Sequence, residues 1–291
     1  MTQAAYVPDG MLAAQAAPAE RWWRRVSVPR VEPRAVGRLG VRAASVAACL
    51  LVWHVASQNQ VRFIINFTNI PSPADVAEAG WTLLTSDRVV NDTLASLLRI
   101  FLGFGLASAL GVGLGVVIGR FRWAEDSLLS PLEVIRPIPA VAWIPMAILM
   151  FASAEGSMIF ITFIGAFFPI LLNTIHGVRQ VDPRLVLASR CLGAGGFSIY
   201  KEVVLPAALP YVVTGLSIGM GTSWFSLVSA EMISGQYGIG YYTWESYNLQ
   251  DYPSLVVGMI AIGILGMGSS ALVRAGGVLC MPWQRVAAKQ R

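Results

Sequence analysis

The sequence predicts an all-α membrane protein with six transmembrane helices. Three observations lead to this fold class: a composition poor in charge, six apolar stretches, and a one-sided distribution of Arg and Lys. Of the 291 residues, 55% are hydrophobic and 13% are charged. A soluble domain carries about 25% charged residues, so this chain has too little charge to cover a surface that faces water.

The six apolar stretches match the length of about 20 residues that a helix needs to cross the hydrocarbon core. In chain order they cover residues 41–57, 93–119, 133–151, 157–176, 211–230 and 254–273. The sequence thus divides into a basic tail (1–40), a transmembrane domain (41–275) and a C-terminal tail (276–291).

Basic residues gather in the segments that lie on one side of the membrane. With the N-terminus inside, 17 of the 21 Lys and Arg residues are cytoplasmic, as the positive-inside rule requires. Both termini and the loop of residues 177–209 are therefore expected in the cytoplasm. The Arg-rich segment 21–42 is interpreted as a topology anchor beside anionic head groups; a lipid-binding or nucleic-acid-binding patch is the alternative.

Outside the membrane, residues 70–84 (IPSPADVAEAGWTLL) predict a short amphipathic helix. Ser72 is its expected N-cap, Pro73 suits the first helical position, and Asp75 complements the positive helix end.

Small residues recur at every fourth position of the second span, which predicts a packing face. They form one stripe on a helix and let a neighbouring backbone approach closely; they are Gly103, Ala107, Gly111, Gly115 and Gly119.

The third span contains Pro137, Pro139 and Pro145 in RPIPAVAWIP. Each proline removes a backbone donor and disfavours a straight helix. We expect a broken helix there, and a break at membrane depth is tolerated only against protein or a water-filled cavity.

The predicted span interiors contain no Asp or Glu, since Glu133 and Glu231 fall at span ends. A proton- or sodium-coupled transporter usually needs an acidic group inside the membrane. Arg99 and Arg136 do fall within spans. Each should snorkel, pair with an acidic group, or face a cavity where it could contact an anion.

The fifth span offers neutral polar groups to a transport pathway. The candidates are Ser223, Trp224 and Ser226. Serine also joins helices as an ordinary hydrogen-bonding group, so packing is the alternative interpretation for each.

The cytoplasmic loop predicts two helices joined by a glycine turn. Asp182 can cap a first helix, with Pro183 at its first position, and Gly193 can end that helix as a C-terminal glycine does. A second helix is expected over residues 197–205, after which Pro206 and Pro210 would redirect the chain into the fifth span.

This loop resembles the "EAA" loop of permease subunits of type I ATP-binding-cassette (ABC) importers. That motif reads E-A-A, three residues, Gly, about nine residues and a hydrophobic-Leu-Pro ending. The matching residues here are Ala188, Ser189, Gly193, Leu205 and Pro206, and Leu187 stands where the family has Glu. Segments typical of the nitrate, sulfonate and taurine branch follow in order over about residues 70–275: IPSPADV, SLLRIFLGF, RPIPAVAWIP, GAFFPILLNT, VDPRL, LPAALPYVVTGL and SAEMI.

The resemblance implies a type I ABC importer permease fold whose loop acts as a coupling helix on a cytosolic ATPase. The residues implied in that coupling are Arg184, Leu187, Ala188, Ser189, Arg190, Gly193, Leu205 and Pro206. The implied partners are two copies of the ATPase, a second copy of this permease, and a substrate-binding protein outside a bacterial inner membrane.

The chain itself is expected to be no enzyme and to bind no cofactor. It has no G-x-x-x-x-G-K-[ST] phosphate loop, so ATP and Mg belong to the partner ATPase. Two histidines and three scattered cysteines supply neither a catalytic nor a metal-binding constellation.

The predicted function is that of a permease subunit of an ATP-driven, binding-protein-dependent importer that works by alternating access. The resemblance implies a small anion of the sulfonate/taurine or nitrate/bicarbonate type as substrate. Two alternatives stay open: an ATP-independent secondary transporter, and a permease of the same family that carries a heterocyclic vitamin precursor.

Overall fold

The computed structural model describes residues 33–60 and 67–283. The chain divides into two units, one up to Val52 and one from Trp53 onward, and each is described by itself. Most of the predicted N-terminal tail (1–32) and the end of the predicted C-terminal tail (284–291) lie outside the described residues.

Helix α1 runs from Pro33 to Gln58, so it begins within the segment expected to be a tail. Its residues Gly40–Gln58 are long and apolar enough to cross a membrane, which agrees with the first predicted span. In the second unit, the indole N–H of Trp53 donates to the carbonyl of Pro71 at 3.1 Å, and the Ser57 hydroxyl donates to the carbonyl of Ile70 at 2.6 Å.

Helix α2 (Pro73–Leu84) has the predicted cap. The Asp75 N–H donates to the Ser72 hydroxyl at 3.3 Å, and the Ser72 N–H donates to the Asp75 carboxylate at 2.9 Å. This reciprocal capping box satisfies two of the free N–H groups at the helix start. Hydrogen bonding of the Ser72 side chain and backbone N–H to the Asp75 carboxylate holds the pKa of that carboxyl below its usual value.

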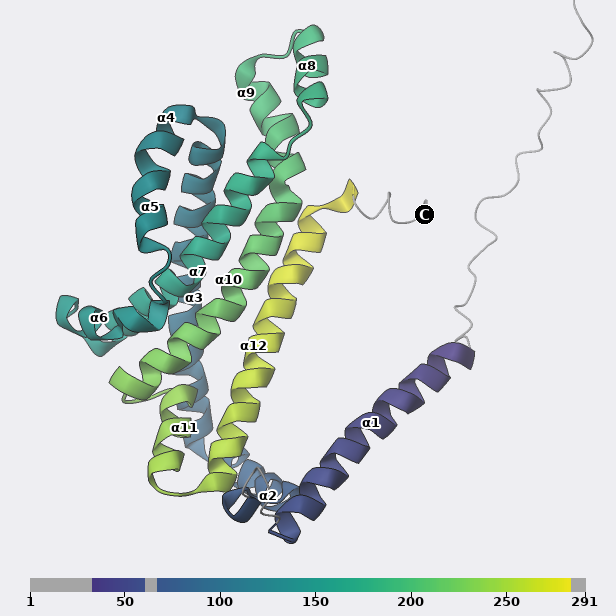
Figure 1. Cartoon of the computed structure of the whole chain (residues 1–291), viewed down its shortest axis with the longest axis vertical. Coiled ribbons are helices and arrows are strands. Elements are labelled where there is room, and N and C mark those ends of the chain that lie inside the picture. Colours follow the sequence, from purple (N-terminus) through teal and green to yellow (C-terminus); the bar gives the residue numbers. More distant parts are fainter. Residues whose placement is uncertain (1–32, 61–66, 284–291) are drawn as a thin grey trace, which may run out of the picture. The chain divides into compact units, whose positions relative to one another are not determined.

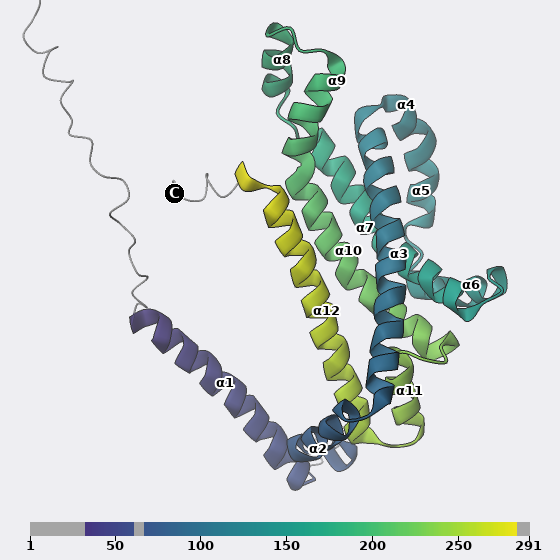
Figure 2. The same cartoon turned by 180° about the vertical axis from the view of Figure 1, so that it is seen from behind.

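Four long helices form the body of the second unit: α3 (Asp87–Arg120), α7 (Ala154–Arg179), α10 (Leu205–Ser234) and α12 (Tyr252–Cys280). Helix α7 lies between α3 and α10, and α12 packs on the other side of α10 (Figures 1 and 2). Helices α8 (Pro183–Cys191) and α9 (Gly196–Ile199) lie at one end, and α2 and α11 (Ile239–Asn248) lie at the other. Helix α12 extends beyond the predicted domain boundary at residue 275.

The small-residue stripe of α3 is confirmed as a packing face against α7. Gly103, Ala107, Gly111 and Gly115 are buried. A Cβ atom built on Gly115 would lie 2.6 Å from the Cβ of Thr174 and 2.9 Å from the carbonyl oxygen of Leu171. Such distances leave no room for a methyl group, so glycine sets how closely the two helices approach.

A second, adjacent face of α7 meets α10 in the same way. A Cβ on Gly165 would lie 2.2 Å from the hydroxyl of Ser226, and one on Gly177 would lie 2.6 Å from the Cβ of Tyr211. Helix α7 is therefore in close contact with helices on two sides.

The third predicted span is not one straight crossing. A helical arm over Arg122–Ile135 ends before Pro137, and a second arm over Ala140–Met150 leaves it at 83°. The expected break is confirmed, but the predicted start at residue 133 is wrong, because the first arm begins at Arg122. Within the described residues, five helices are long and apolar enough to span a membrane, and the bent pair makes a sixth if its arms count as one span.

The start of the fifth span also differs from the prediction. Helix α9, a π-helical turn over Tyr200–Val204 and α10 join into one helical segment, Gly196–Ser234, of 39 residues. Pro206 and Pro210 therefore do not redirect the chain. A proline ring clashes with the carbonyl four residues earlier in a regular helix, and the wider π turn just before Pro206 relieves that crowding.

The α3–α7 contact predicts opposite effects for two neighbouring glycines. Gly115→Ala should destabilise the protein by about 1–3 kcal/mol, because overpacking forces the helices apart. Gly113 has no atom within 4 Å of an added Cβ, so Gly113→Ala should be neutral or slightly stabilising, since Ala is the better helix former. Thermal unfolding of the two purified variants in detergent measures the difference; equal melting temperatures would contradict the packing argument.

Candidate functional site

Helix α8 and the turn after it form a hairpin with α9, here called the α8–α9 hairpin (residues 182–204). The Asp182 carboxylate accepts a hydrogen bond from the backbone N–H of Arg184 at 2.8 Å, and Pro183 stands at the first helical position. Both features were predicted, and together they fix where α8 begins.

The C-terminus of α8 is closed by a Schellman motif. The N–H of Ala194 donates to the carbonyl of Ser189 at 3.0 Å, and the N–H of Gly193 donates to the carbonyl of Arg190 at 2.9 Å. Gly193 has φ of +82°, the left-handed conformation that this motif requires and that glycine adopts without strain. The turn therefore has a fixed shape.

The hairpin rests on a small apolar core and exposes apolar side chains at its tip. Buried Val178, Ile199, Val204 and Ala208 form that core, and Val186 of α8 packs against them. None of the residues of α8 is buried. Leu187, Leu192 and Phe197 are 57%, 89% and 78% exposed, which leaves an apolar surface for a partner.

The predicted coupling residues lie either in the α8–α9 hairpin or at the start of α10. Arg184, Leu187, Ala188 and Arg190 are exposed on α8, and the Ser189 hydroxyl donates to the carbonyl of Leu185 at 2.8 Å. Gly193 forms the turn. Leu205 and Pro206 instead lie at the start of α10, beyond the π turn.

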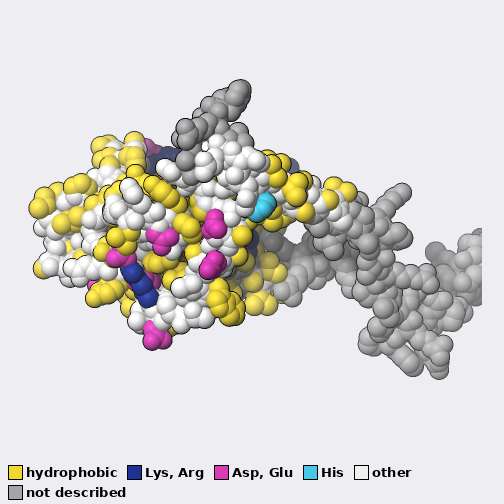
Figure 3. All heavy atoms as spheres, turned by 90° about the horizontal axis from the view of Figure 1, so that it is seen from below, with side chains coloured by type: hydrophobic (Ala, Val, Ile, Leu, Met, Phe, Trp, Pro, Cys, Tyr) yellow, Lys and Arg dark blue, Asp and Glu magenta, His cyan; other side chains and the backbone are white. Residues whose placement is uncertain are grey.

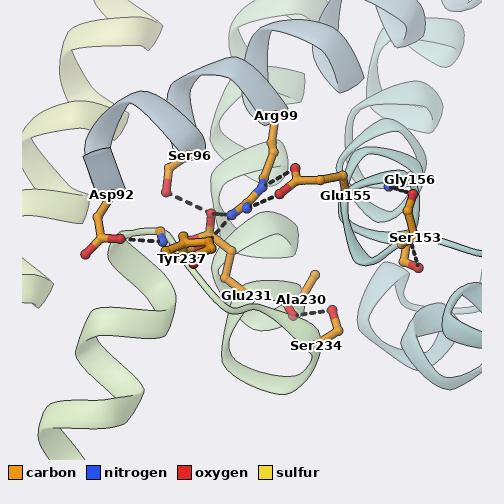
Figure 4. A network of polar contacts seen from close by, with 12 residues as sticks. Asp92, Ser96, Arg99, Ser153, Glu155, Gly156, Ala230, Glu231, Ser234 and Tyr237 are labelled. Atoms are coloured by element: carbon orange, nitrogen blue, oxygen red, sulfur yellow. Dashed lines mark hydrogen bonds and ion pairs between the residues drawn. The ribbon is translucent and has the colours of Figure 1, made fainter. Parts of the chain in front are cut away.

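At the opposite end of the unit, Arg99 is the centre of a polar network (Figure 4). Its guanidinium contacts the Glu231 carboxylate of α10 at 2.8 Å and the Glu155 carboxylate of α7 through two nitrogens, one at 2.7 Å. It also donates to the carbonyl of Tyr237 at 2.6 Å. The side chain of Arg99 is only 2% exposed.

Glu231 is fully buried and its carboxylate is fully hydrogen-bonded. One oxygen accepts from Arg99 and from the Ser96 hydroxyl at 2.8 Å, and the other accepts from the Gly240 N–H at 2.9 Å. The nearby Gly238 has φ of +124°, and a Cβ there would lie 2.3 Å from Glu231. The turn into α11 therefore needs glycine to close over this carboxylate.

Asp92 extends the network along α3. Its carboxylate accepts from the Gly238 N–H at 3.0 Å and from Arg88 at 3.3 Å, and Arg88 also pairs with Glu245 of α11. The network thus joins α3, α7, α10 and α11 through charged groups.

These contacts extend one prediction and resolve another. Glu231, predicted at a span end, lies in the last turn of α10 and is buried there, as is Asp92 in the second turn of α3. For Arg99, the pairing alternative describes the structure, so its charge is already balanced. Sequence analysis missed Asp92 and Ser96, although their spacing with Arg88 and Arg99 places all four on one helix face.

The remaining candidate pathway residues lie apart from Arg99. Arg136 is exposed at the bend of the third span. The Trp224 indole donates to the Ser269 hydroxyl of α12 at 2.7 Å, and Ser226 packs against Gly165. The Ser223 hydroxyl is buried without a hydrogen-bond partner in the described part of the chain. Trp224 and Ser226 thus take part in helix packing.

The Arg99 network predicts a large difference between two arginines. Arg99→Met should destabilise the protein by about 3–5 kcal/mol, because it leaves a buried carboxylate unpaired. Arg179→Met removes a pair with Glu125 whose side chains are 40% and 41% exposed, and it should cost at most about 1 kcal/mol. Thermal unfolding in detergent gives both values.

The double variant Arg99→Met, Glu231→Gln tests the cause of that loss. It should recover part of the stability, since no uncompensated charge then remains at Glu231. Equal melting temperatures for the Arg99→Met and Arg179→Met variants would show that the network contributes little.

Comparison with known proteins identifies the family of this chain. Residues 110–279 match the model of the family described as "Binding-protein-dependent transport system inner membrane component". The chain is 35% identical over 234 residues to the nitrate import permease protein NrtB of Synechocystis sp., which covers 77% of this chain and 83% of that protein. It is 38% identical over 177 residues to the bicarbonate transport system permease protein CmpB of Synechococcus elongatus, and these residues are 60% of this chain and 63% of that protein.

Two further similarities extend the comparison. A putative ABC transporter permease protein of Methanocaldococcus jannaschii is 41% identical over 186 residues, which are 64% of this chain and 70% of that protein. The methionine ABC transporter MetNI in an inward facing conformation matches 71% of this chain and 94% of the solved chain, at 20% identity and a TM-score of 0.49. The family model spans more than half of the chain and NrtB is similar over most of its length, so the chain belongs to the binding-protein-dependent transport system inner membrane components, the permease subunits of ABC transporters.

Proposed function

We propose that this permease subunit belongs to an importer for a small oxyanion of the nitrate or bicarbonate type, driven by a separate ATPase in the bacterial inner membrane. The observation that carries the proposal is the α8–α9 hairpin, a capped helix and a glycine turn with an exposed apolar tip. Its second arm is the first part of a continuous 39-residue helical segment, Gly196–Ser234.

The continuous helix supports a mechanical role for the hairpin. A force on its tip would act on α10 directly, since Gly196–Ser234 is one helical segment. Helix α10 packs closely on α7, and α7 packs closely on α3. An ATPase dimer would contact two hairpins, one from each of two permease copies. Its closure would therefore change the packing of the spans and open the pathway first to one side of the membrane and then to the other.

The sidedness of the proposal follows from the charge distribution. The hairpin would face the cytosol, with both termini on that side. Helices α2 and α11 would face outward, where a substrate-binding protein docks. Figure 3 shows this outer end, where several acidic side chains lie among apolar ones.

The substrate class rests on the relatives. Relatives 35% and 38% identical to this chain are named for nitrate and bicarbonate, and both are small oxyanions. Arg99 is paired with two carboxylates, so it does not offer an unbalanced positive charge to an anion. We therefore assign most of the substrate selection to the separate binding protein.

A pair of glycine variants tests the hairpin. Gly193 has φ of +82° and open space around an added Cβ, so Gly193→Ser introduces backbone strain alone, about 1–2 kcal/mol. That strain should loosen the turn and reduce the amount of ATPase that co-purifies with tagged permease from native membranes. Gly195→Ser is the matched control, because Gly195 has φ of −70° at an N-cap position that serine favours.

Equal recovery of the ATPase with the two variants would contradict a coupling role for the turn.

Transport in proteoliposomes tests the function itself. Proteoliposomes that contain the permease, its ATPase and its binding protein should take up nitrate or bicarbonate only when ATP is supplied on the side of the membrane that carries the ATPase. Uptake of an aliphatic sulfonate or a heterocyclic compound, and of neither anion, would overturn the substrate class. Uptake by this chain alone without ATP would overturn the importer assignment.

A further inference from the structure

A groove with two arginines lies between the end of α3 and the α8–α9 hairpin. Its volume is about 440 Å³. Most of its lining is apolar, including Val186 and Leu187 of α8. Its charged groups are Arg120 at the end of α3 and Arg190 in the last turn of α8, and no Asp or Glu lines it.

Neither arginine has a carboxylate partner. Among the residues that the structure describes, Arg120 and Arg190 are absent from the ion pairs. Arg120 instead lies 5.5 Å from the ring centre of its neighbour Phe121. Both side chains are on exposed residues and are therefore open to a partner.

Two acidic groups at this end of the molecule have other roles, and Glu202 of the π turn does not line the groove. Glu125 pairs with Arg179 at 2.9 Å. Asp182 caps α8 through the backbone N–H of Arg184. Neither of these carboxylates therefore neutralises the two arginines that line the groove.

A third polar group in the groove also lacks a partner. The Tyr200 hydroxyl is buried and has no hydrogen-bond partner in the described part of the chain. Tyr200 lines this groove and, with Arg120, also lines a second hollow. A buried hydroxyl without a partner costs stability, so a ligand that hydrogen-bonds to it would be favoured.

We infer that this groove receives an acidic side chain of the ATPase, held by Arg190 and Arg120. Guanidinium groups bind carboxylates in a bidentate manner. The exposed Leu187 and Phe197 beside the groove suit a folded protein surface, because they would bury apolar area around the charged contact. The inference rests on the proposed function. It adds that the permease supplies the positive side of the coupling contact and the ATPase supplies the negative side.

Charge reversal in the groove tests the inference. The permease is placed in nanodiscs of uncharged lipid, and purified ATPase is titrated onto it at low and high salt. Arg190→Glu and Arg120→Glu should each weaken ATPase binding by about tenfold or more, as for other dehydrated charge pairs across interfaces. Arg122→Glu is the matched control: Arg122 is exposed two residues after Arg120 but does not line the groove, and its reversal should change binding by about twofold at most.

A compensating change identifies the partner group. An acidic residue of the ATPase that crosslinks to position 190 is replaced by Lys. That ATPase should bind the Arg190→Glu permease better than the unmodified ATPase does, and it should bind the unmodified permease worse. A weakening that no ATPase charge reversal compensates would overturn the inference.

The outcomes separate this inference from the proposed function. Wild-type binding by both groove variants, with ATP-driven uptake intact, would overturn the inference and leave the permease role standing. The same titration is repeated in nanodiscs that contain anionic lipid. If the groove variants lose ATPase binding only in those nanodiscs, the groove is assigned to a lipid head group and the inference is overturned. Failure of the unmodified permease to bind any ABC ATPase would overturn the proposed function itself.

Discussion

Close contact between helix backbones is the constraint on which the rest of this structure depends. Helix α7 approaches α3 on one side and α10 on the other through small residues, and an added Cβ at Gly115 or Gly165 would clash with the facing helix. Inside a membrane, helices gain little from hydrophobic exclusion and associate through packing and interhelical hydrogen bonds. The small residues therefore decide which helices are neighbours, and those neighbours decide where Arg99, Glu231 and the hairpin lie.

The Arg99 network stabilises the end of the molecule that carries α11. A buried arginine and a buried glutamate are each expensive alone, but here each has several partners. Arg99 contacts Glu231 and Glu155, and Glu231 accepts three hydrogen bonds. Glycines at 238 and 240 let the backbone close over the carboxylate. The network thus joins three long helices to the turn before α11 at one end, while the opposite end holds the hairpin.

The hairpin differs from that end in its exposure. Its base is packed on Ile199 and Val204, yet its tip exposes Leu187, Leu192 and Phe197. A fixed Schellman turn, an apolar tip and a groove with unpaired arginines are features that a partner would complete. The continuous helix from Gly196 to Ser234 connects that surface to the closely packed core, so the proposed binding at the tip would be linked mechanically to the packing of the spans.

Local chemistry in the sequence determined much of this protein. The length of the apolar stretches predicted the spans, and the spacing of Gly103 to Gly119 predicted the packing face. Asp182, Pro183 and Gly193 predicted the ends of α8. These features are local because caps and helix periodicity depend on residues a few positions apart. Contacts between distant residues were decided only by the tertiary structure. Glu155 and Glu231 are 76 positions apart, and only Glu231 was interpreted, as a residue at a span end, yet both contact Arg99. The prolines predicted a break in the third span but not its angle of 83°, and they did not predict that the helix continues through Pro206. Pairing and direction are set by which surfaces meet, and no local pattern contains that information.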